Sequence, residues 1–180
     1  MLSAAMFTIV AVLWPRADAL TQQGHMANCT AIPATNAQYN TVYVNNSCFL
    51  AELSPMTVTH NDGPAYCAAL NVSGLTGWRV AVIRSSETGD AVKASLCPAC
   101  NEILASVYQL DMTVEPAGGW FYGNNISEPA VPFDGIWASG EPNNFIGLEH
   151  CGVYNMAPGN GYPVHDVDCT RSEATICEHR

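Results

Sequence analysis

Oxygen-bearing side chains gather in the last quarter of the sequence, at a spacing suited to a hard cation. Calcium takes about six to eight oxygen ligands from carboxylates, amide carbonyls and water. A cis bond before Pro142 would let the residues on its two sides converge on one point. A disulfide between Cys151 and Cys169 would bring two further carboxylates together from separate strands. The four candidate ligands are Glu141, Asn143, Glu149 and Asp166.

The elements that must position these residues form a mixed pattern. A polar stretch with β-branched insertions and a turn at Asn45-Asn46 predicts an N-terminal hairpin over about residues 27–50. Residues 59–70 have helical spacing with Pro64 in the first turn, and residues 79–83 are a short β-like run. Ser85 or Ser86 caps a second predicted helix, which runs from Glu87 to about Leu96. The chain therefore predicts an α+β fold.

A long segment between about Val114 and Asn144 is rich in Gly, Pro, Asn and aromatic residues. Loops of this length are usually functional or disordered, and four aromatic rings favour order here. Trp120 and Trp137 could stack on sugar rings, although a place in the core of the loop is the preferred interpretation. Residues 151–177 alternate short apolar pieces with turns and predict paired strands.

The N-terminus predicts export. Ala4 to Trp14 is an apolar run that Pro15 interrupts, and Ala17-Asp18-Ala19 has the small residues that signal peptidase reads. We expect residues 1–19 to be a signal peptide and residues 20–180 to be a single domain. The run is too short for a membrane-spanning helix, and no later segment is long and apolar enough. The predicted location is extracellular.

All eight cysteines lie in the predicted mature chain, and an even number in an exported protein indicates disulfides. The count alone leaves 105 pairings open. Asn28, Asn45, Asn71 and Asn125 each begin an N-x-S/T triplet, consistent with a glycoprotein. The net charge of −10, with only six Lys and Arg, argues against a nucleic-acid partner.

Taken together, these motifs resemble the C-type lectin domain family. The resemblance rests on aromatic residues before Glu141-Pro142-Asn143, on the two spaced acidic–cysteine pairs, and on the ending Ile176-Cys177-Glu178. The segment 65–67 is similar to the first-helix cysteine of the family, and residues 80–87 are similar to the strand that leads into its second helix. The likeness extends from Cys29 to Glu178.

The resemblance implies a C-type lectin-like fold with two helices, small antiparallel sheets and a long binding loop. It implies the disulfides Cys29–Cys48, Cys67–Cys177 and Cys151–Cys169. It also implies that Glu141, Asn143, Glu149 and Asp166 hold Ca²⁺ and contact a sugar, with His165 as a further sugar-contacting position. In the family the Glu-Pro-Asn form favours mannose, fucose, glucose and N-acetylglucosamine, so the implied partners are glycans or glycoproteins.

Two positions depart from the family pattern. His165 stands where the family has an asparagine that binds both calcium and sugar, and imidazole suits zinc or copper better than calcium. Residues 107–110 are a poor match to the central Trp-Ile-Gly-Leu marker. The second hypothesis is therefore a calcium-independent domain of the same fold that binds a protein.

Other chemistries are weaker hypotheses. His150 and His165 could hold zinc with Glu149 and Asp166, although two surface histidines are the preferred interpretation. Cys97 and Cys100 have the spacing of a redox pair. Because they follow a helix instead of starting one, a local bridge is preferred. No Ser/His/Asp or Cys/His nucleophile arrangement stands out, so the sequence predicts no enzyme.

Overall fold

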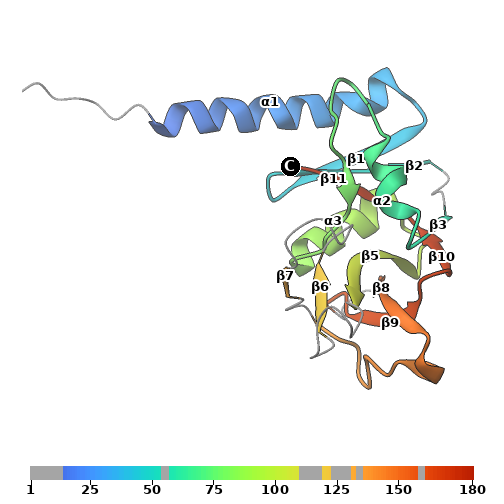
Figure 1. The fold of residues 1–180 in the computed structure, drawn as a ribbon. Coiled ribbons are helices and arrows are strands. Elements are labelled where there is room, and N and C mark those ends of the chain that lie inside the picture. Colours follow the sequence, from blue (N-terminus) through green and yellow to red (C-terminus); the bar gives the residue numbers. More distant parts are fainter. Residues whose placement is uncertain (1–13, 54–56, 110–118, 123–130, 133–135, 158–160) are drawn as a thin grey trace, which may run out of the picture.

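The computed structural model describes residues 14–53, 57–109, 119–122, 131–132, 136–157 and 161–180 (Figure 1). Its first element is the helix α1, Trp14–Thr35, which extends away from the body of the molecule (Figure 1). The predicted hairpin over residues 27–50 is wrong in its first part, because residues 27–35 belong to α1. The predicted cleavage after Ala19 falls within this helix and stays a prediction.

The end of α1 is helical despite Pro33, which has no N–H to donate to the carbonyl of Cys29. The hydroxyl of Thr41 donates to that carbonyl instead, at 2.9 Å. Cys29 and Ile32 lie three positions apart on one helix face, and both are fully buried. Burial of this face, together with the substitute hydrogen bond, explains why the segment is helical where composition predicted a strand.

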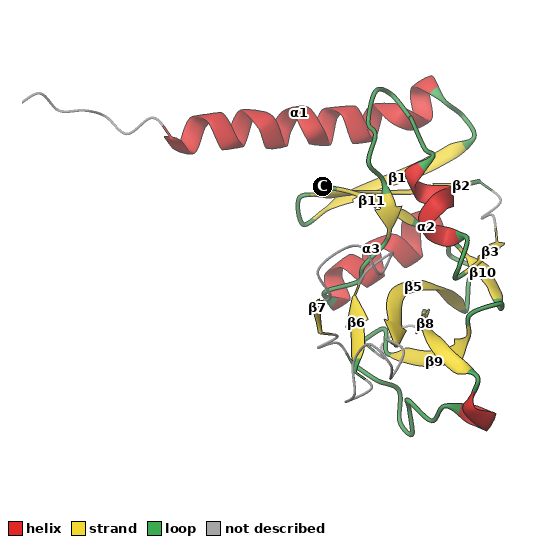
Figure 2. Ribbon diagram, viewed as in Figure 1, coloured by secondary structure: helices red, strands yellow, loops and turns green. Residues whose placement is uncertain are grey.

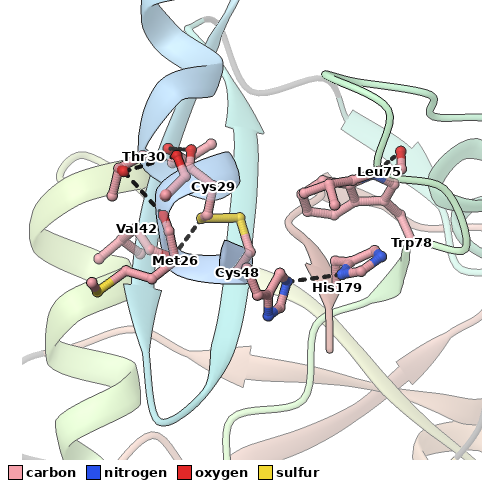
Figure 3. The surroundings of a disulfide bond; sticks show 11 residues. Met26, Cys29, Thr30, Val42, Cys48, Leu75, Trp78 and His179 are labelled. Atoms are coloured by element: carbon pink, nitrogen blue, oxygen red, sulfur yellow. Dashed lines mark hydrogen bonds between the residues drawn. A yellow bond between two sulfur atoms is a disulfide. The ribbon is translucent and has the colours of Figure 1, made fainter. Parts of the chain in front are cut away.

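A disulfide from Cys29 to Cys48 fastens α1 to the first sheet (Figure 3). Beside it, His179 Nδ1 lies 2.9 Å from Nε2 of His25 on α1. The ring of His179 also packs against Trp78, with the ring centroids 5.4 Å apart (Figure 3). The helix is therefore held to the domain by one covalent bond, by hydrogen bonds such as that from Thr41 to Cys29, and by ring contacts.

The first sheet joins the two ends of the described chain. Strands β1 (Tyr39–Val44) and β2 (Ser47–Glu52) form a hairpin around Asn45-Asn46, which confirms the predicted turn. The sheet order is β1-β2-β11-β4, with β11 at Cys177–His179 and β4 at Arg79–Val80 (Figure 2). Both asparagines of the turn have positive φ, which asparagine tolerates better than most residues.

Two helices pack near this sheet. Helix α2, Gly63–Ala68, is shorter than the predicted 59–70, because Thr57–Thr59 forms the strand β3. Helix α3, Ser86–Leu96, agrees with the prediction, and the Ser85 hydroxyl accepts a hydrogen bond from Thr88 N at its start. This N-cap hydrogen bond satisfies one of the backbone N–H groups of the first turn that have no partner within the helix.

The second sheet carries the C-terminal half of the chain. Its order is β3-β10-β5-β6-β7, and β8 pairs with both β5 and β9. All pairs are antiparallel except β10 with β5. The strands are β5 (Glu102–Gln109), β6 (Trp120–Tyr122), β7 (Val131–Pro132), β8 (Glu149–Asn155), β9 (Val164–Asp168) and β10 (Ser172–Ala174).

The core lies where the sheets and α3 meet. Phe49 of β2, Val92 of α3, Ile103 of β5 and Tyr154 of β8 are buried in one cluster. All four expected disulfides are present, including Cys97–Cys100 at the end of α3. Among the helices of the described ranges, none is both long and apolar enough to cross a membrane.

Gly89 gives a packing test of this core. A Cβ built on Gly89 would lie 2.2 Å from the ring of Tyr162, which is buried and bonds Asp90 through its hydroxyl. We expect Gly89→Ala to destabilise the protein by about 1–3 kcal/mol through overpacking, even though alanine favours helices. Gly24→Ala is the matched control, since nothing lies within 4 Å of that position in α1. Urea unfolding of both variants measures the difference, and equal stability of the two would contradict the packing argument.

Candidate functional site

The candidate ligands lie at the end of the molecule opposite α1 and the C-terminus (Figure 1). The loop 136–148 leads into β8, and its start is held to β9 by backbone hydrogen bonds between Ile136, Ala138 and Val164. Strands β8 and β9 are paired, and the disulfide Cys151–Cys169 joins them at the loop end. Two chain segments about 20 residues apart are thereby fixed side by side.

Glu141, Asn143 and Asp166 form one hydrogen-bonded group. The Glu141–Pro142 bond is cis. The side-chain amide of Asn143 donates to Glu141 Oε2 at 2.7 Å, and its backbone N–H donates to Asp166 Oδ1 at 3.0 Å. Asp166 is 3% exposed and accepts a second backbone hydrogen bond, from Asn144 at 2.6 Å. Three of the four predicted ligands therefore meet.

The two carboxyl groups of this site perturb each other. A side-chain hydrogen bond with Asp166 raises the pKa of Glu141 above its ordinary value, and burial adds to the effect. Burial pushes the pKa of Asp166 upward as well. Hydrogen bonds from Glu141 and from the Asn144 and Asn143 amides outweigh this, so the pKa of Asp166 ends below its ordinary value. The pair therefore favours sharing one proton, an arrangement that a bound cation would replace.

Glu149 lies beside this group without joining it. Its carboxylate accepts a hydrogen bond from the backbone of Phe145 at 2.8 Å, and its own N–H donates to the side chain of Asn144 at 3.2 Å. Within the ranges that the structure describes, no three His, Cys, Asp or Glu side chains are grouped to hold a metal ion. The four-ligand arrangement predicted from the sequence therefore stays a prediction as a whole.

His165 does not join the group of Glu141, Asn143 and Asp166. His165 and Asp166 are consecutive in β9, so their side chains leave opposite faces of the strand. His165 Nε2 lies 3.3 Å from the side-chain amide of Asn155. Asp168, which could have compensated for His165, bonds Thr170 through its carboxylate at 2.8 Å. The zinc hypothesis, which needs His150 and His165 with acidic partners, finds no such group among the described residues.

The ligand atoms of this group nevertheless fit a hard cation in chemical type. Glu141 and Asp166 supply carboxylate oxygens and Asn143 supplies an amide oxygen, which are the ligands that calcium prefers. A carboxyl pair close enough to share a proton is an unfavourable place for two negative charges without a cation. These three residues would hold such an ion, with Glu149 at the edge of the group.

Three exposed apolar side chains lie in the loop that carries the site, and the sequence did not predict their exposure. Phe145, Ile146 and Leu148 are 66%, 75% and 53% exposed, in and after the short helix η1 at Phe145–Gly147. Ile146 has φ +52°, which is unusual for a β-branched residue and occurs mainly at functional positions. They follow the Gly/Pro-rich segment directly, and no periodic pattern in the sequence indicates their exposure.

Trp120 and Trp137 pack edge to face with ring centroids 4.8 Å apart. Both are partly buried against the main core cluster. Their position agrees with the preferred interpretation of these rings as part of the core beneath the loop.

Comparison with known proteins identifies the fold. Neither family models nor curated sequences match the chain. Among solved structures, the C-type lectin CEL-I from Cucumaria echinata is 14% identical, with TM-score 0.56, over 77% of this chain and 93% of that one. The C-type lectin domain of murine dendritic cell inhibitory receptor 2, solved with an N-glycan, is 17% identical, with TM-score 0.56, over 78% and 95%.

A calcium-independent type II antifreeze protein is similar to the same extent, at 20% identity and TM-score 0.56 over 77% of this chain and 90% of that one. At such identities the likeness concerns the fold and not the ligand. The element order, the two sheets, the helices α2 and α3 and the disulfides agree with it. This chain therefore has the α+β C-type lectin-like fold.

Proposed function

We propose that this protein is a secreted, non-enzymatic lectin that binds mannose-type sugars through Ca²⁺ at the end of the loop 136–148. The supporting observation is the group formed by Glu141, Asn143 and Asp166. Its two carboxyls and one amide give the mixture of acceptors and donors that sugar hydroxyls require. Glu149 is proposed as a further ligand. Bound calcium would take two neighbouring sugar hydroxyls as ligands.

Export of the chain is part of this proposal. Four disulfides are consistent with an extracellular location, because such bonds persist in oxidising compartments. The signal peptide at residues 1–19 and the cleavage after Ala19 belong to the proposal as well. N-terminal sequencing of the protein secreted from eukaryotic cells tests both.

The binding test uses mannose-agarose. The protein is expected to be retained in millimolar calcium chloride and released by EDTA, while galactose-agarose retains much less. Calorimetry with calcium in parallel should show heat and a rise in melting temperature, since a ligand that binds the folded state stabilises it. Retention that EDTA does not affect, or no calcium heat, would refute calcium-dependent sugar binding.

A second candidate function is calcium-independent recognition of a protein. Exposed Phe145, Ile146 and Leu148 favour it, because apolar patches on a surface often mark protein contacts. The position of His165, away from Asp166, favours it too. Calcium calorimetry separates the candidates. Absence of heat, with an intact melting transition, supports this second function.

Glycosylation of the exported chain is expected to avoid Asn45. Its side-chain amide donates to the hydroxyls of Ser85 and Thr88, and the Ser47 hydroxyl of its triplet bonds the buried Glu178. A glycan on this nitrogen would displace those contacts. Asn71 is exposed and serves as the comparison site. Enzymatic deglycosylation in heavy-oxygen water, followed by peptide mass spectrometry, should label Asn71 and leave Asn45 unlabelled; label at Asn45 would contradict the expectation.

A further inference from the structure

A cavity lies at the other end of the molecule from the calcium candidate. It has a volume of about 450 Å³, within the usual range for small-molecule sites. The turn of the β1–β2 hairpin, the start of α3 and the residues around β11 enclose it. Figure 1 shows the C-terminus and this hairpin far from η1 and β9. The cavity therefore does not depend on the proposed calcium site.

Positive charge is concentrated at this cavity. Glu178 is 1% exposed and lies among three arginines, with Arg180 Nε at 2.5 Å, Arg84 at 3.7 Å and Arg79 at 3.8 Å. Arg84 and Arg180 line the cavity together with Glu178, whereas Arg79 does not, so the lining carries two positive charges against one negative charge. These arginines are three of the six basic residues in a chain whose net charge is −10. One arginine would be enough to neutralise the charge of Glu178.

The carboxylate of Glu178 is already well supplied with donors. The Ser47 hydroxyl donates to it at 2.8 Å and the Val82 N–H at 3.3 Å, in addition to Arg180. Arg84 makes only its 3.7 Å ion pair and no hydrogen bond to any described residue. Because a guanidinium has five N–H donors, most of those on Arg84 are available for another acceptor.

The rest of the wall suits the body of a ligand. Ser85 and Thr88 bring hydroxyl groups at the start of α3. One of the two donates to the other and both accept from Asn45, so one hydroxyl hydrogen is left for a ligand. Val44 and Phe49 bring apolar surface. Glu87, the acidic residue of the first turn of α3, does not line the cavity. An anion at this place would meet two arginines, one hydroxyl donor and an apolar wall, with Glu178 already compensated.

We propose that this cavity is a binding site for a small organic anion, whose carboxylate, sulfate or phosphate group is held by Arg84 and Arg180. Arginine binds such groups with paired hydrogen bonds that lysine cannot reproduce. The hydroxyl of the Ser85–Thr88 pair that does not donate to the other donates to the ligand body, and Val44 and Phe49 pack against it. The same chemistry fits an acidic sugar or a free small anion.

The experiment titrates methyl sulfate into the full-length mature protein in EDTA, with sodium chloride at equal ionic strength as the blank. EDTA removes calcium, so failure here is distinct from failure of the proposed sugar site. Nitrogen-15 NMR should show saturable shifts at Ser85, Thr88 and the arginine Nε of Arg84. The proposal would be overturned if these resonances did not shift at a methyl sulfate concentration about 50 times that of the protein, nor at any higher concentration up to its solubility limit.

Arginine variants test the assignment. Arg84→Gln and Arg180→Gln should each weaken methyl sulfate binding about tenfold or more, because a charge-assisted hydrogen bond is lost. Arg84→Lys should recover only part of it. Arg171→Gln is the matched control, since Arg171 pairs with Glu102 and Glu173 elsewhere. Unchanged affinity in both Arg84→Gln and Arg180→Gln, with melting curves that show folded protein, would overturn the proposal.

Two further probes identify the source of the anion. Glucose 6-sulfate that binds more tightly than methyl sulfate, with the same dependence on Arg84, supports an acidic sugar. Equal affinities for both probes, again dependent on Arg84, support a free small anion. Glucose without the sulfate should not bind in EDTA; if it binds as well as glucose 6-sulfate, the anion proposal is wrong.

Discussion

Asp166→Asn is expected to weaken calcium binding, and with it calcium-dependent retention on mannose, at least about a hundredfold. The carboxylate accepts backbone hydrogen bonds from Asn143 and Asn144 and contacts Glu141. Each hydrogen bond to a charged group contributes about 1.5–3 kcal/mol. Asparagine keeps one acceptor oxygen, so the substitution loses one of these hydrogen bonds together with a charged calcium ligand, and a hundredfold change requires about 2.7 kcal/mol.

Calorimetry with calcium measures this effect, and Asp168→Asn is the matched control. Asp168 lies two residues further along β9, carries the same side chain and is exposed, and its carboxylate bonds Thr170 in the following turn. Its substitution should change calcium affinity less than about threefold, within the scatter usual for surface changes. Equal losses of calcium affinity in the two variants would contradict a calcium site formed by Glu141, Asn143 and Asp166.

Removing the disulfide Cys67–Cys177 should cause the largest loss of stability of any cysteine pair. It closes a loop of 110 residues, and both cysteines are fully buried between α2 and β11. Chain entropy gives about 4.7 kcal/mol for a loop of roughly 100 residues. A double Cys→Ala variant should therefore unfold at much lower urea concentration than the unmodified protein, with tryptophan fluorescence as the signal.

The pair Cys97–Cys100 is the control for this prediction. Its separation of three residues gives about 1.6 kcal/mol on the same entropy relation. Double Cys→Ala variants of the two pairs should thus differ by roughly 3 kcal/mol. If both variants lose the same stability, loop length does not determine the contribution of these disulfides.

Local signals were sufficient for some elements of the fold. Ser85 predicted the start of α3, and Asn45-Asn46 predicted the turn between β1 and β2. The end of α1 was not predictable from local signals, because its helical form depends on Thr41 replacing a donor that Pro33 lacks. That contact joins residues 12 positions apart, and no local pattern specifies it.

The candidate site was predictable in composition and less so in geometry. The spacing of Glu141, Asn143 and Asp166 was enough to expect them together, and they meet. Whether Glu149 joins them depends on whether its carboxylate binds an ion or accepts the hydrogen bond from the Phe145 backbone. The sequence does not specify that balance, because it depends on how the loop is placed in three dimensions. The direction of His165 follows from the alternation of β9, which requires the strand boundaries to be known.

The opposite placement of the two candidate sites has a practical consequence for immobilising the protein. A bead or affinity tag attached after Arg180 would leave the loop 136–148 facing the solution. A glycan array probed with such a protein would therefore measure binding at the proposed calcium site alone. The same attachment would crowd the cavity that Arg84 and Arg180 line. Screening for acidic compounds should therefore use an untagged chain. Many copies anchored by the C-terminal end would present their loops in one direction, and avidity would then add to weak single contacts.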